Sequence, residues 1–256
     1  MFTQALLIAL WAGICGVDMF DGLTHIHRPL VSGLVVGAIL GNVETGLIAG
    51  ATLELVWMGM VPLAGAQPPN VVIGGIIGTA FAILANLEPT VAVGIAVPFA
   101  VAMQGMITLL FTVFSPVMHK ADQFARSANT NGIDRVNYLG LTVLFLMYFI
   151  VAFLPIYFGA ESATAIVQSL PETFIAGLSI AGGMMPAIGF AMLLKIMLKK
   201  DYVAFLIIGF ILVAYVGLDI LAVALLAGAF AAYDFFNTKR IEASVETSGG
   251  GYSDGI

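Results

Sequence analysis

Long apolar runs, rather than any motif, set the first limit on how this chain can fold. A helix that crosses a bilayer needs about twenty mostly apolar residues, and such runs follow one another along most of the 256 residues. Hydrophobic residues make up 61% of the chain and charged residues only 9%, and the mean hydropathy is +1.07. Since a soluble domain carries about a quarter charged residues, the sequence predicts an integral membrane protein.

The pattern within the runs decides between the two architectures that span membranes. Strands of a membrane barrel alternate apolar and polar residues over about ten positions, whereas the runs here are longer and do not alternate strictly. The 29 glycines and 10 prolines suit tightly packed and interrupted membrane helices. We therefore predict an all-α polytopic helical bundle with re-entrant or broken helices.

The apolar runs fall into two length classes. The longer ones, read as full spans, are Thr3 to Phe20, Val43 to Pro62, Val91 to Met118, Tyr138 to Phe158 and Phe174 to Lys195. The shorter ones, some of which are expected to enter the membrane and turn back, are Leu30 to Gly41, Val71 to Leu84, Tyr202 to Gly217 and Leu218 to Phe236. The expected organisation is one membrane-embedded domain over residues 1–240 and a flexible tail over residues 241–256, which contains SGGGYSDG.

The few charged residues orient the C-terminal half of the chain. Basic residues gather in His119–Asn137, in Lys195–Lys200 and in Lys239–Arg240, whereas Gly159–Glu172 carries acidic residues and no basic one. The positive-inside rule places the three basic clusters in the cytoplasm and Gly159–Glu172 outside. His119–Asn137 is then an extramembrane loop, and the C-terminus is cytoplasmic. Arg28 is the only basic residue before Lys120 and orients the N-terminal half much less strongly.

Several function classes are excluded. Nine Lys and Arg against fifteen Asp and Glu give a net charge of −6, so the chain has no basic surface for nucleic acid. The single cysteine, Cys15, allows neither an intrachain disulfide nor a thiolate metal cluster. The patterns GxxxxGK[ST], HExxH and GxSxG are absent. We therefore expect a non-catalytic chain without a metal or other cofactor.

A glycine-rich segment carries the most informative acidic residue. In GLVVGAILGNVETGLIAGATLEL, glycines recur every four residues, and Gly46 and Gly50 lead to Glu54 at the next step. At 3.6 residues per turn, Glu54 shares a helix face with these glycines. A carboxylate inside an apolar span costs about 2.5–3.5 kcal/mol, so it should face a partner or a polar cavity. Glu54 is a candidate contact for the hydroxyls of a polar solute, and a buried structural glutamate is the alternative.

Two interruptions divide apolar segments, GAQPPN at 65–70 and AGGMMP at 181–186. Irregular backbone at membrane depth is tolerated only where it is buried in protein or lines a watery cavity, and transporters place such breaks at the substrate site. Gln67 and Asn70 flank the double proline and offer amides that both donate and accept hydrogen bonds. They are candidate solute contacts, unless the breaks are interfacial loops.

The stretch DMFDGLTHIHRP, at 18–29, concentrates acids, histidines and an arginine. Asp18 and Asp21 lie three residues apart, on one face of a helix, and either anchor the membrane interface or reach into the solute site. His25 and His27 allow a metal site or a proton or phosphate relay, although both signals are weak. Gln104, inside an apolar run, makes an interhelical hydrogen bond or contacts the solute.

The ordered combination of HRPL, GLIAGATLEL and AGGMMPAIG resembles the IIC membrane component of the mannose/fructose/sorbose family of bacterial sugar phosphotransferase systems. The resemblance extends over about residues 1 to 240. The motif QPPN and the ending YSDGI are most similar to the N-acetylgalactosamine or galactosamine branch. His25 stands where the mannose branch has glutamine, so its role stays open.

This resemblance implies a function and a set of partners. Family members pair with a second membrane component, IID, and the pairs assemble as trimers in the bacterial cytoplasmic membrane. Phosphate passes through cytoplasmic IIA and IIB components, and IIB phosphorylates the sugar, so the IIC chain itself binds and translocates it. For this chain the resemblance implies an amino sugar, N-acetylgalactosamine, bound by Glu54 and the Gln67–Asn70 turn. The alternatives are a mannose- or sorbose-specific member, an ion-coupled sugar transporter, and a membrane receptor or scaffold.

The same features suggest how the sugar moves. We expect glycine-faced helices and broken segments to form a sugar-bearing unit that slides against a scaffold, part of which the partner chain contributes. Close glycine packing would permit the movement, and polar side chains would hold the hydroxyls.

Overall fold

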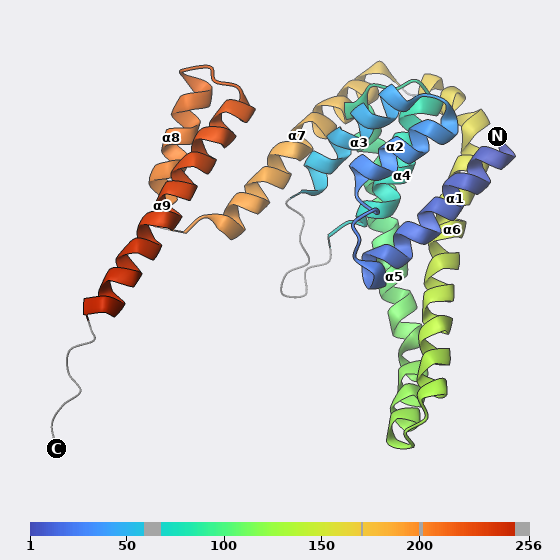
Figure 1. Ribbon diagram of the computed structural model, residues 1–256. Helices are drawn as coiled ribbons and strands as arrows, with labels where there is room; N and C mark the ends of the chain where they lie inside the picture. The colour runs from blue at the N-terminus through green and yellow to red at the C-terminus, as the bar shows by residue number, and fades with distance from the viewer. Residues whose placement is uncertain (59–67, 170, 200–201, 249–256) are drawn as a thin grey trace. The chain divides into compact units, whose positions relative to one another are not determined.

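The computed structural model describes residues 1–58, 68–169, 171–199 and 202–248, and its regular structure over these residues is helical (Figure 1). The helices are α1 (Phe2–Val17), the short π-helix η1 (Asp18–Gly22), α2 (Pro29–Leu40), α3 (Val43–Trp57), α4 (Val71–Leu84), α5 (Pro89–Arg126), α6 (Thr130–Ser169), α7 (Glu172–Met197), α8 (Val203–Ala214) and α9 (Ile220–Ser248). The all-α prediction is confirmed. The chain divides into two compact units, Met1–Ile196 and Met197–Ile256, and the predicted domain boundary after residue 240 stays a prediction.

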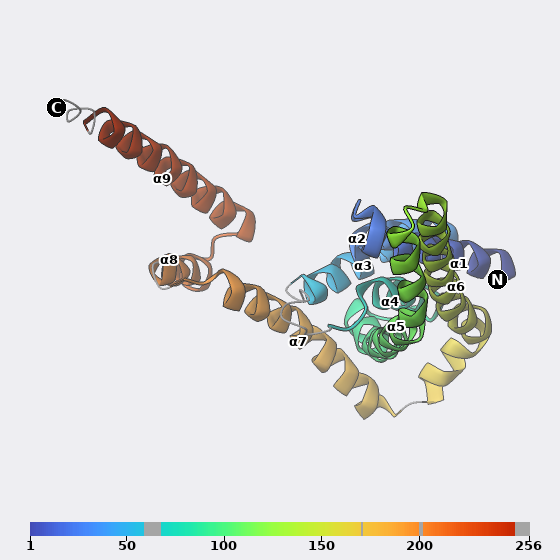
Figure 2. The same ribbon diagram turned by 90° about the horizontal axis from the view of Figure 1, so that it is seen from below.

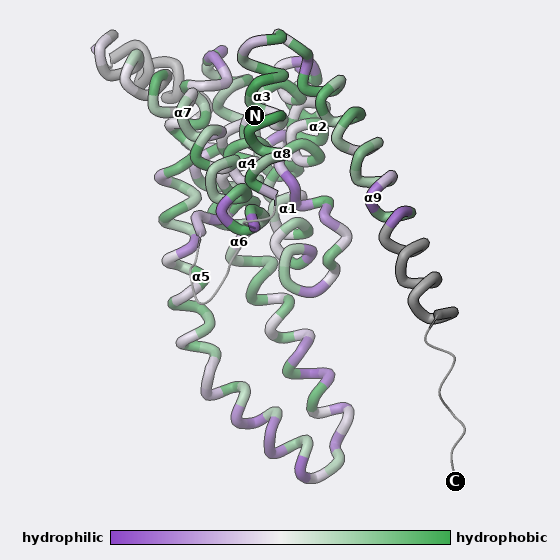
Figure 3. The backbone as a smooth tube through the Cα atoms, turned by 90° about the vertical axis from the view of Figure 1, so that its left-hand side faces the viewer, coloured by the Kyte–Doolittle hydropathy of each residue, from purple (hydrophilic) through white to green (hydrophobic). Residues whose placement is uncertain are grey.

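Helices of two lengths are present, but two runs differ from the prediction: α3 ends at Trp57, short of the predicted full span Val43 to Pro62, and Ile220–Asn237, predicted among the shorter runs, is long enough to span. The described helical segments long and apolar enough to cross a membrane are Phe2–Gly22, Pro89–Arg126, Thr130–Gly159 and Ile220–Asn237. Figure 3 shows the apolar character of α5 and α6 giving way to hydrophilic residues at the turn that joins them. By contrast, α2 and α3 have 12 and 15 residues. At about 1.5 Å per residue each is roughly 20 Å long, less than the ~30 Å hydrocarbon core.

Proline and asparagine residues set the helix starts. Pro29 and Pro89 occupy the first positions of α2 and α5, where a missing N–H costs no intrahelical bond. Asn42 caps α3 by accepting from the Thr45 N–H at 3.1 Å, and Asn70 caps α4 by accepting from the Ile73 N–H at 3.0 Å. Gly41 ends α2 with a φ of 83°, which favours glycine.

The two predicted interruptions have different outcomes. Pro68 to Asn70 are non-helical and separate α3 from α4, so the break at the double proline is confirmed for these residues. The predicted interruption at AGGMMP is wrong, because α7 runs through it with Pro186 inside the helix. A proline removes a single backbone donor, and membrane helices tolerate this loss where neighbours or local adjustments satisfy the freed carbonyl.

Two other irregular segments were also predicted where the structure is helical. Most of the predicted loop His119–Asn137 is helical, since α5 continues to Arg126 and α6 starts at Thr130. The turn between them includes Ala128, whose φ is 51°. Helix α9 continues to Ser248, inside the segment predicted to be a disordered tail.

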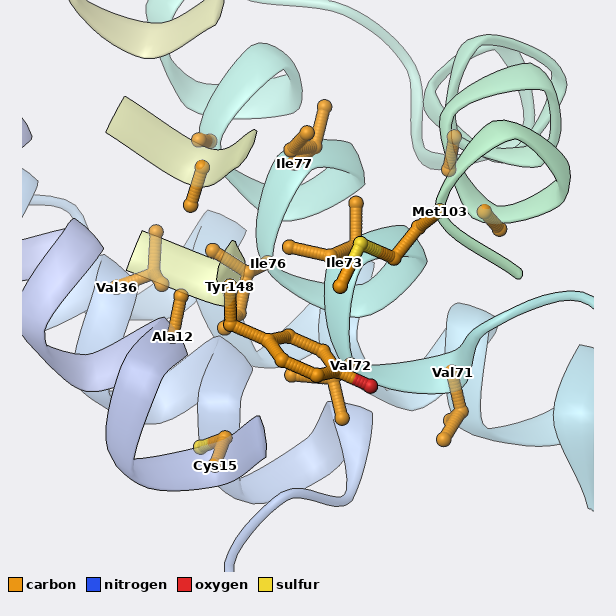
Figure 4. Close-up of a cluster of buried hydrophobic side chains, with 14 of the residues drawn as sticks. Ala12, Cys15, Val36, Val71, Val72, Ile73, Ile76, Ile77, Met103 and Tyr148 are labelled. Atoms are coloured by element: carbon orange, nitrogen blue, oxygen red, sulfur yellow. The ribbon is translucent and has the colours of Figure 1, made fainter. Parts of the chain in front are cut away.

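Helix α4 lies at the centre of the first unit, among α1, α2, α3, α5 and α6 (Figure 2). Its side chains Val72, Ile73, Ile76 and Ile77 are fully buried, and the ring of Tyr148 from α6 lies among them (Figure 4). Glycine makes room for this ring, because a Cβ at Gly16 of α1 would overlap it. The unit therefore has a close-packed core around α4.

Candidate functional site

The glycine stripes of α2 and α3 pack directly on each other. A Cβ added to Gly33 would lie 2.5 Å from the backbone oxygen of Gly46, and one added to Gly46 would lie 2.5 Å from the backbone oxygen of Gly33. A Cβ at Gly50 would lie 2.7 Å from the carbonyl oxygen of Pro29. The two backbones are in contact, and a side chain has no room between them. The stripe predicted as a sliding surface therefore joins α2 and α3 into one antiparallel hairpin.

This packing brings Glu54 of α3 to the start of α2. Arg28, the residue before α2, donates hydrogen bonds from Nε and Nη2 to Oε1 of Glu54, the first over 2.6 Å. The backbone N–H of Leu30 donates to Oε2 over 3.3 Å. The side chains of Arg28 and Glu54 are 32% and 18% exposed. The carboxylate thus pairs with the guanidinium and accepts from a backbone N–H at the N-terminus of α2 that has no partner within the helix. It also stays partly accessible to a solute.

A second carboxylate organises the connection between α1 and α2. Asp18 Oδ1 accepts from the backbone N–H of Thr24 at 2.7 Å and from its hydroxyl at 2.5 Å. Asp18 Oδ2 lies 2.6 Å from Nδ1 of His27 and accepts from the His27 backbone N–H at 3.4 Å. Asp18 and His27 are 4% and 7% exposed. We call Asp18, Thr24 and His27 the clasp. Because His27 directly precedes Arg28, the clasp holds in place the residue that pairs with Glu54.

The backbone inside the clasp has an uncommon shape. Leu23 and His25 have φ values of 50° and 63°, in the left-handed region that few non-glycine residues adopt. A Cβ at Gly22 would lie only 3.0 Å from Oδ1 of Asp18. The four hydrogen bonds to Asp18 compensate for this conformation.

Asn70 links four elements, α4, α5, α6 and η1, from a fully buried position. Its Oδ1 caps α4, its Nδ2 donates to the hydroxyl of Tyr148 over 2.6 Å, and its backbone N–H donates to the carbonyl of Ala100 over 2.9 Å. Its Nδ2 and the Tyr148 hydroxyl both lie 3.8 Å from the sulfur of Met19 in η1. In this conformation Asn70 holds the end of the non-helical segment Pro68 to Asn70 in place and has no surface open to a solute.

The other predicted site residues lie elsewhere. Asp21 is exposed and lines a hollow of about 370 Å³ with aromatic residues of η1 and α5, among them Phe111. His25 is exposed, and Gln104 is half-buried within α5. Gln67 lies outside the described residues.

The prediction that Asp18 and Asp21 share one helix face is wrong, because the structure buries Asp18 and exposes Asp21. The reason is the π-helix, in which hydrogen bonds run from i to i+5 and the faces no longer follow the α-helical spacing.

Sequence reasoning missed Arg28 and Tyr148 as partners of the predicted residues. A signal for Arg28 existed, since a carboxylate in an apolar span needs a partner and Arg28 is the only basic residue other than histidine before Lys120. Tyr148 had no such signal, because its contact with Asn70 spans 78 residues of sequence.

These groups are able to form hydrogen bonds with a polar solute. Arg28 and Glu54 together present both a donor and an acceptor at an accessible position, as recognition of sugar hydroxyls requires. Within the described part of the chain, no three His, Cys, Asp or Glu side chains come together as metal ligands would.

Comparisons with known proteins show which family the chain is similar to. The family model EII-Sor, described as the PTS system sorbose-specific IIC component, matches residues 2–233. The chain is 36% identical to the N-acetylgalactosamine permease IIC component 1 of Escherichia coli (strain K12) over 237 residues, which cover 92% of this chain and 89% of that protein.

Two solved structures are also similar. A chain described only as a membrane protein matches with a TM-score of 0.83 at 26% identity, covering 92% of this chain and 96% of that one. A chain in the complex of the mannose transporter ManYZ with microcin E492 matches with a TM-score of 0.59 at 26% identity, covering 92% of this chain and 95% of its own length. The chain therefore belongs to the IIC family of phosphotransferase-system sugar permeases, and the resemblance seen in its sequence motifs is confirmed.

Proposed function

We propose that this IIC permease binds N-acetylgalactosamine and moves it inward across the bacterial cytoplasmic membrane, where a IIB component phosphorylates it. The observation that carries the choice of sugar is the similarity to an N-acetylgalactosamine permease IIC component along 92% of the chain. The double proline of QPPN, which the structure leaves non-helical before α4, supports the same branch.

In the proposed site, Glu54 accepts hydrogen bonds from sugar hydroxyls while Arg28 holds its carboxylate. Asp18 acts through the clasp, and Asn70 acts by positioning the proline turn. The proposal also includes direct contacts between the sugar and four further residues, Asp21, His25, Gln67 and Gln104. The sugar reaches them when the protein changes conformation during transport, or from the side of the partner subunit.

The interlocked glycines suggest which part moves as a body. Because α2 and α3 are in backbone contact, we propose that this hairpin moves as one unit with Glu54, and that sliding occurs between this unit and other elements. A IID subunit supplies part of the scaffold, IIC–IID pairs form trimers, and the C-terminus meets the IIA and IIB components in the cytoplasm. The similarity to a chain of the ManYZ complex supports a second membrane subunit.

Uptake of labelled sugar tests this function. Cells that lack other routes for N-acetylgalactosamine and express this chain with IID, IIB and IIA should accumulate the sugar as its phosphate ester. Membrane vesicles without phosphoenolpyruvate and the soluble components should accumulate none. Accumulation of unmodified sugar in such vesicles, driven by a cation gradient, would instead show an ion-coupled transporter. Phosphorylated mannose or sorbose in place of N-acetylgalactosamine would overturn the choice of sugar.

A further inference from the structure

Trp57, the last residue of α3, carries a hydrogen-bond donor that the fold leaves unused. Its side chain is 2% exposed, and its buried indole Nε1 has no hydrogen-bond partner among the described residues. An indole N–H can only donate, and a buried donor without an acceptor costs free energy. The hydroxyl of Thr79, also buried without a partner in the described part of the chain, can turn to a carbonyl of its own helix, which an indole cannot do. The donor of Trp57 is therefore available to an acceptor from outside the chain.

The ring of Trp57 lies between two candidates for sugar binding, Glu54 and the segment that ends at Asn70. Glu54 precedes Trp57 by three residues on α3, and this spacing makes the two side chains neighbours on the helix. A Cβ at Gly74 of α4 would lie 2.5 Å from Cη2 and Cζ2 of Trp57, so the six-membered ring packs directly on the α4 backbone. The Gly74 N–H donates to the carbonyl of Asn70 over 3.1 Å. Trp57 thus connects the α2–α3 hairpin, which carries Glu54, with the start of α4.

We propose that the indole N–H of Trp57 binds the acetamido carbonyl of N-acetylgalactosamine, which makes Trp57 a specificity-determining residue for acetylated sugars. This inference rests on the proposed function and deepens it, because it names the side chain that recognises the group by which this sugar differs from galactose. An amide oxygen accepts through two lone pairs and matches a side chain that can only donate. Glu54 accepts from hydroxyls, so the two residues bind groups of opposite hydrogen-bonding character.

The buried position of Trp57 fits a contact that is made during transport. Its ring lies where the α2–α3 hairpin meets α4, and Ala100 of α5 is close by, with its Cβ 3.1 Å from a Cβ at Gly74. In the proposed movement the hairpin slides against other elements, so this contact opens and the N–H meets the sugar that Glu54 holds. A sugar without the carbonyl binds more weakly, because the donor then lacks its matching acceptor.

The test compares two neutral sugars that differ at one carbon. Membranes from cells that express the full chain with its IID subunit are loaded with radiolabelled N-acetylgalactosamine, which is displaced by unlabelled N-acetylgalactosamine or by galactose. Trp57→Phe removes the N–H and keeps an aromatic ring. Because the smaller ring leaves a cavity, a second protein carries benzothienylalanine in place of Trp57, which keeps the ring shape and has sulfur where the N–H was. The matched control is Trp11→Phe, at the other tryptophan of the chain, whose Nε1 donates to Oγ of Ser32 over 3.2 Å.

Wild-type protein should bind N-acetylgalactosamine about tenfold more tightly than galactose. Trp57→Phe and the benzothienylalanine protein should lose most of this preference through weaker binding of N-acetylgalactosamine, whereas Trp11→Phe should keep it. An unchanged preference in the benzothienylalanine protein would overturn the proposal and leave the proposed function intact. An equal loss of affinity for both sugars, or a wild type that binds galactose as tightly as N-acetylgalactosamine, would overturn it as well. If the wild type binds neither sugar, the proposed function itself fails.

Discussion

Two helical hairpins of this chain contain glycines but differ in how these glycines pack. The α2–α3 hairpin is interlocked through its glycines, with the backbone of Gly33 against that of Gly46. In the α8–α9 hairpin, a Cβ at Gly209 or Gly228 would meet no atom within 4 Å. A hollow of about 760 Å³ with aromatic walls, Phe205 and Phe230 among them, lies along α8 and α9. Along Val203–Ala214, all of it described, no residue is buried.

The difference shows that a close backbone contact requires glycine in one hairpin and that no such contact requires it in the other. In α2–α3 it is required by a backbone contact that also sets the position of Glu54. In α8–α9 no contact within the hairpin requires it, and the hairpin itself leaves large apolar side chains such as Phe210 and Phe230 exposed. The glycine content of a helix therefore indicates a tight helix pair only where the backbone that packs against it is known.

The largest expected effect comes from adding one methyl group to the interlocked hairpin. Gly46→Ala places its Cβ 2.5 Å from the Gly33 oxygen and 2.7 Å from Gly37 Cα, and backbone cannot move aside as a side chain does. We expect a loss of about 3 kcal/mol in stability, measured by thermal unfolding in detergent. The matched control is Gly228→Ala in α9, which should unfold within ~1 kcal/mol of the wild type. Equal losses in the two variants would remove the contrast between the hairpins.

A smaller effect is expected from the clasp that leads into α2. Asp18→Asn turns one acceptor oxygen into a donor amide, which leaves hydrogen-bond donors of Thr24 or His27 without an acceptor. The expected cost is about 2 kcal/mol in unfolding free energy. Thr24→Val removes a single donor and should cost about half as much. If Asp18→Asn is as stable as the wild type, the clasp does not hold the connection.

The smallest effect is expected where Tyr148 meets Asn70. Tyr148→Phe keeps the buried ring and removes the hydroxyl that accepts from Asn70 Nδ2 at 2.6 Å. Removing this acceptor should lower the free energy of unfolding by about 1 kcal/mol, which a shift of the melting curve reports. Tyr233→Phe in α9, where the tyrosine is 72% exposed, should cause no shift. A shift of the same size in both variants would argue against the buried hydrogen bond.

Local signals predicted most of the helices. The run Val71 to Leu84 is the helix α4 as observed, and Leu30 to Gly41 corresponds to α2, because proline, asparagine and glycine punctuate both. The same logic failed at Pro186, since one proline does not decide whether a membrane helix stops. It also failed between α5 and α6, where polar residues continue both helices beyond the apolar run.

Around the candidate site, local helical spacing was predictable from the sequence and the tertiary contacts were not. The spacing from Gly50 to Glu54 correctly put the acid on the glycine face, because helical periodicity is local. Residue spacing does not show that this stripe packs against α2. Nor does it show the π-helix that buries Asp18 and exposes Asp21. Asn70 was read as a solute contact, and its buried bond to Tyr148 depends on a residue far along the chain.

Sugar binding by Glu54→Gln tests the central claim most directly, namely that the interlocked hairpin presents Glu54 to the sugar. In membranes that contain the full chain and its IID subunit, the variant should lose at least about tenfold in affinity for labelled N-acetylgalactosamine, because the amide pairs more weakly with Arg28 and accepts more weakly from hydroxyls. Glu44→Gln on the same helix should bind as the wild type does. Unchanged affinity in an assembled, folded Glu54→Gln protein would contradict the assignment of Glu54 to the sugar site.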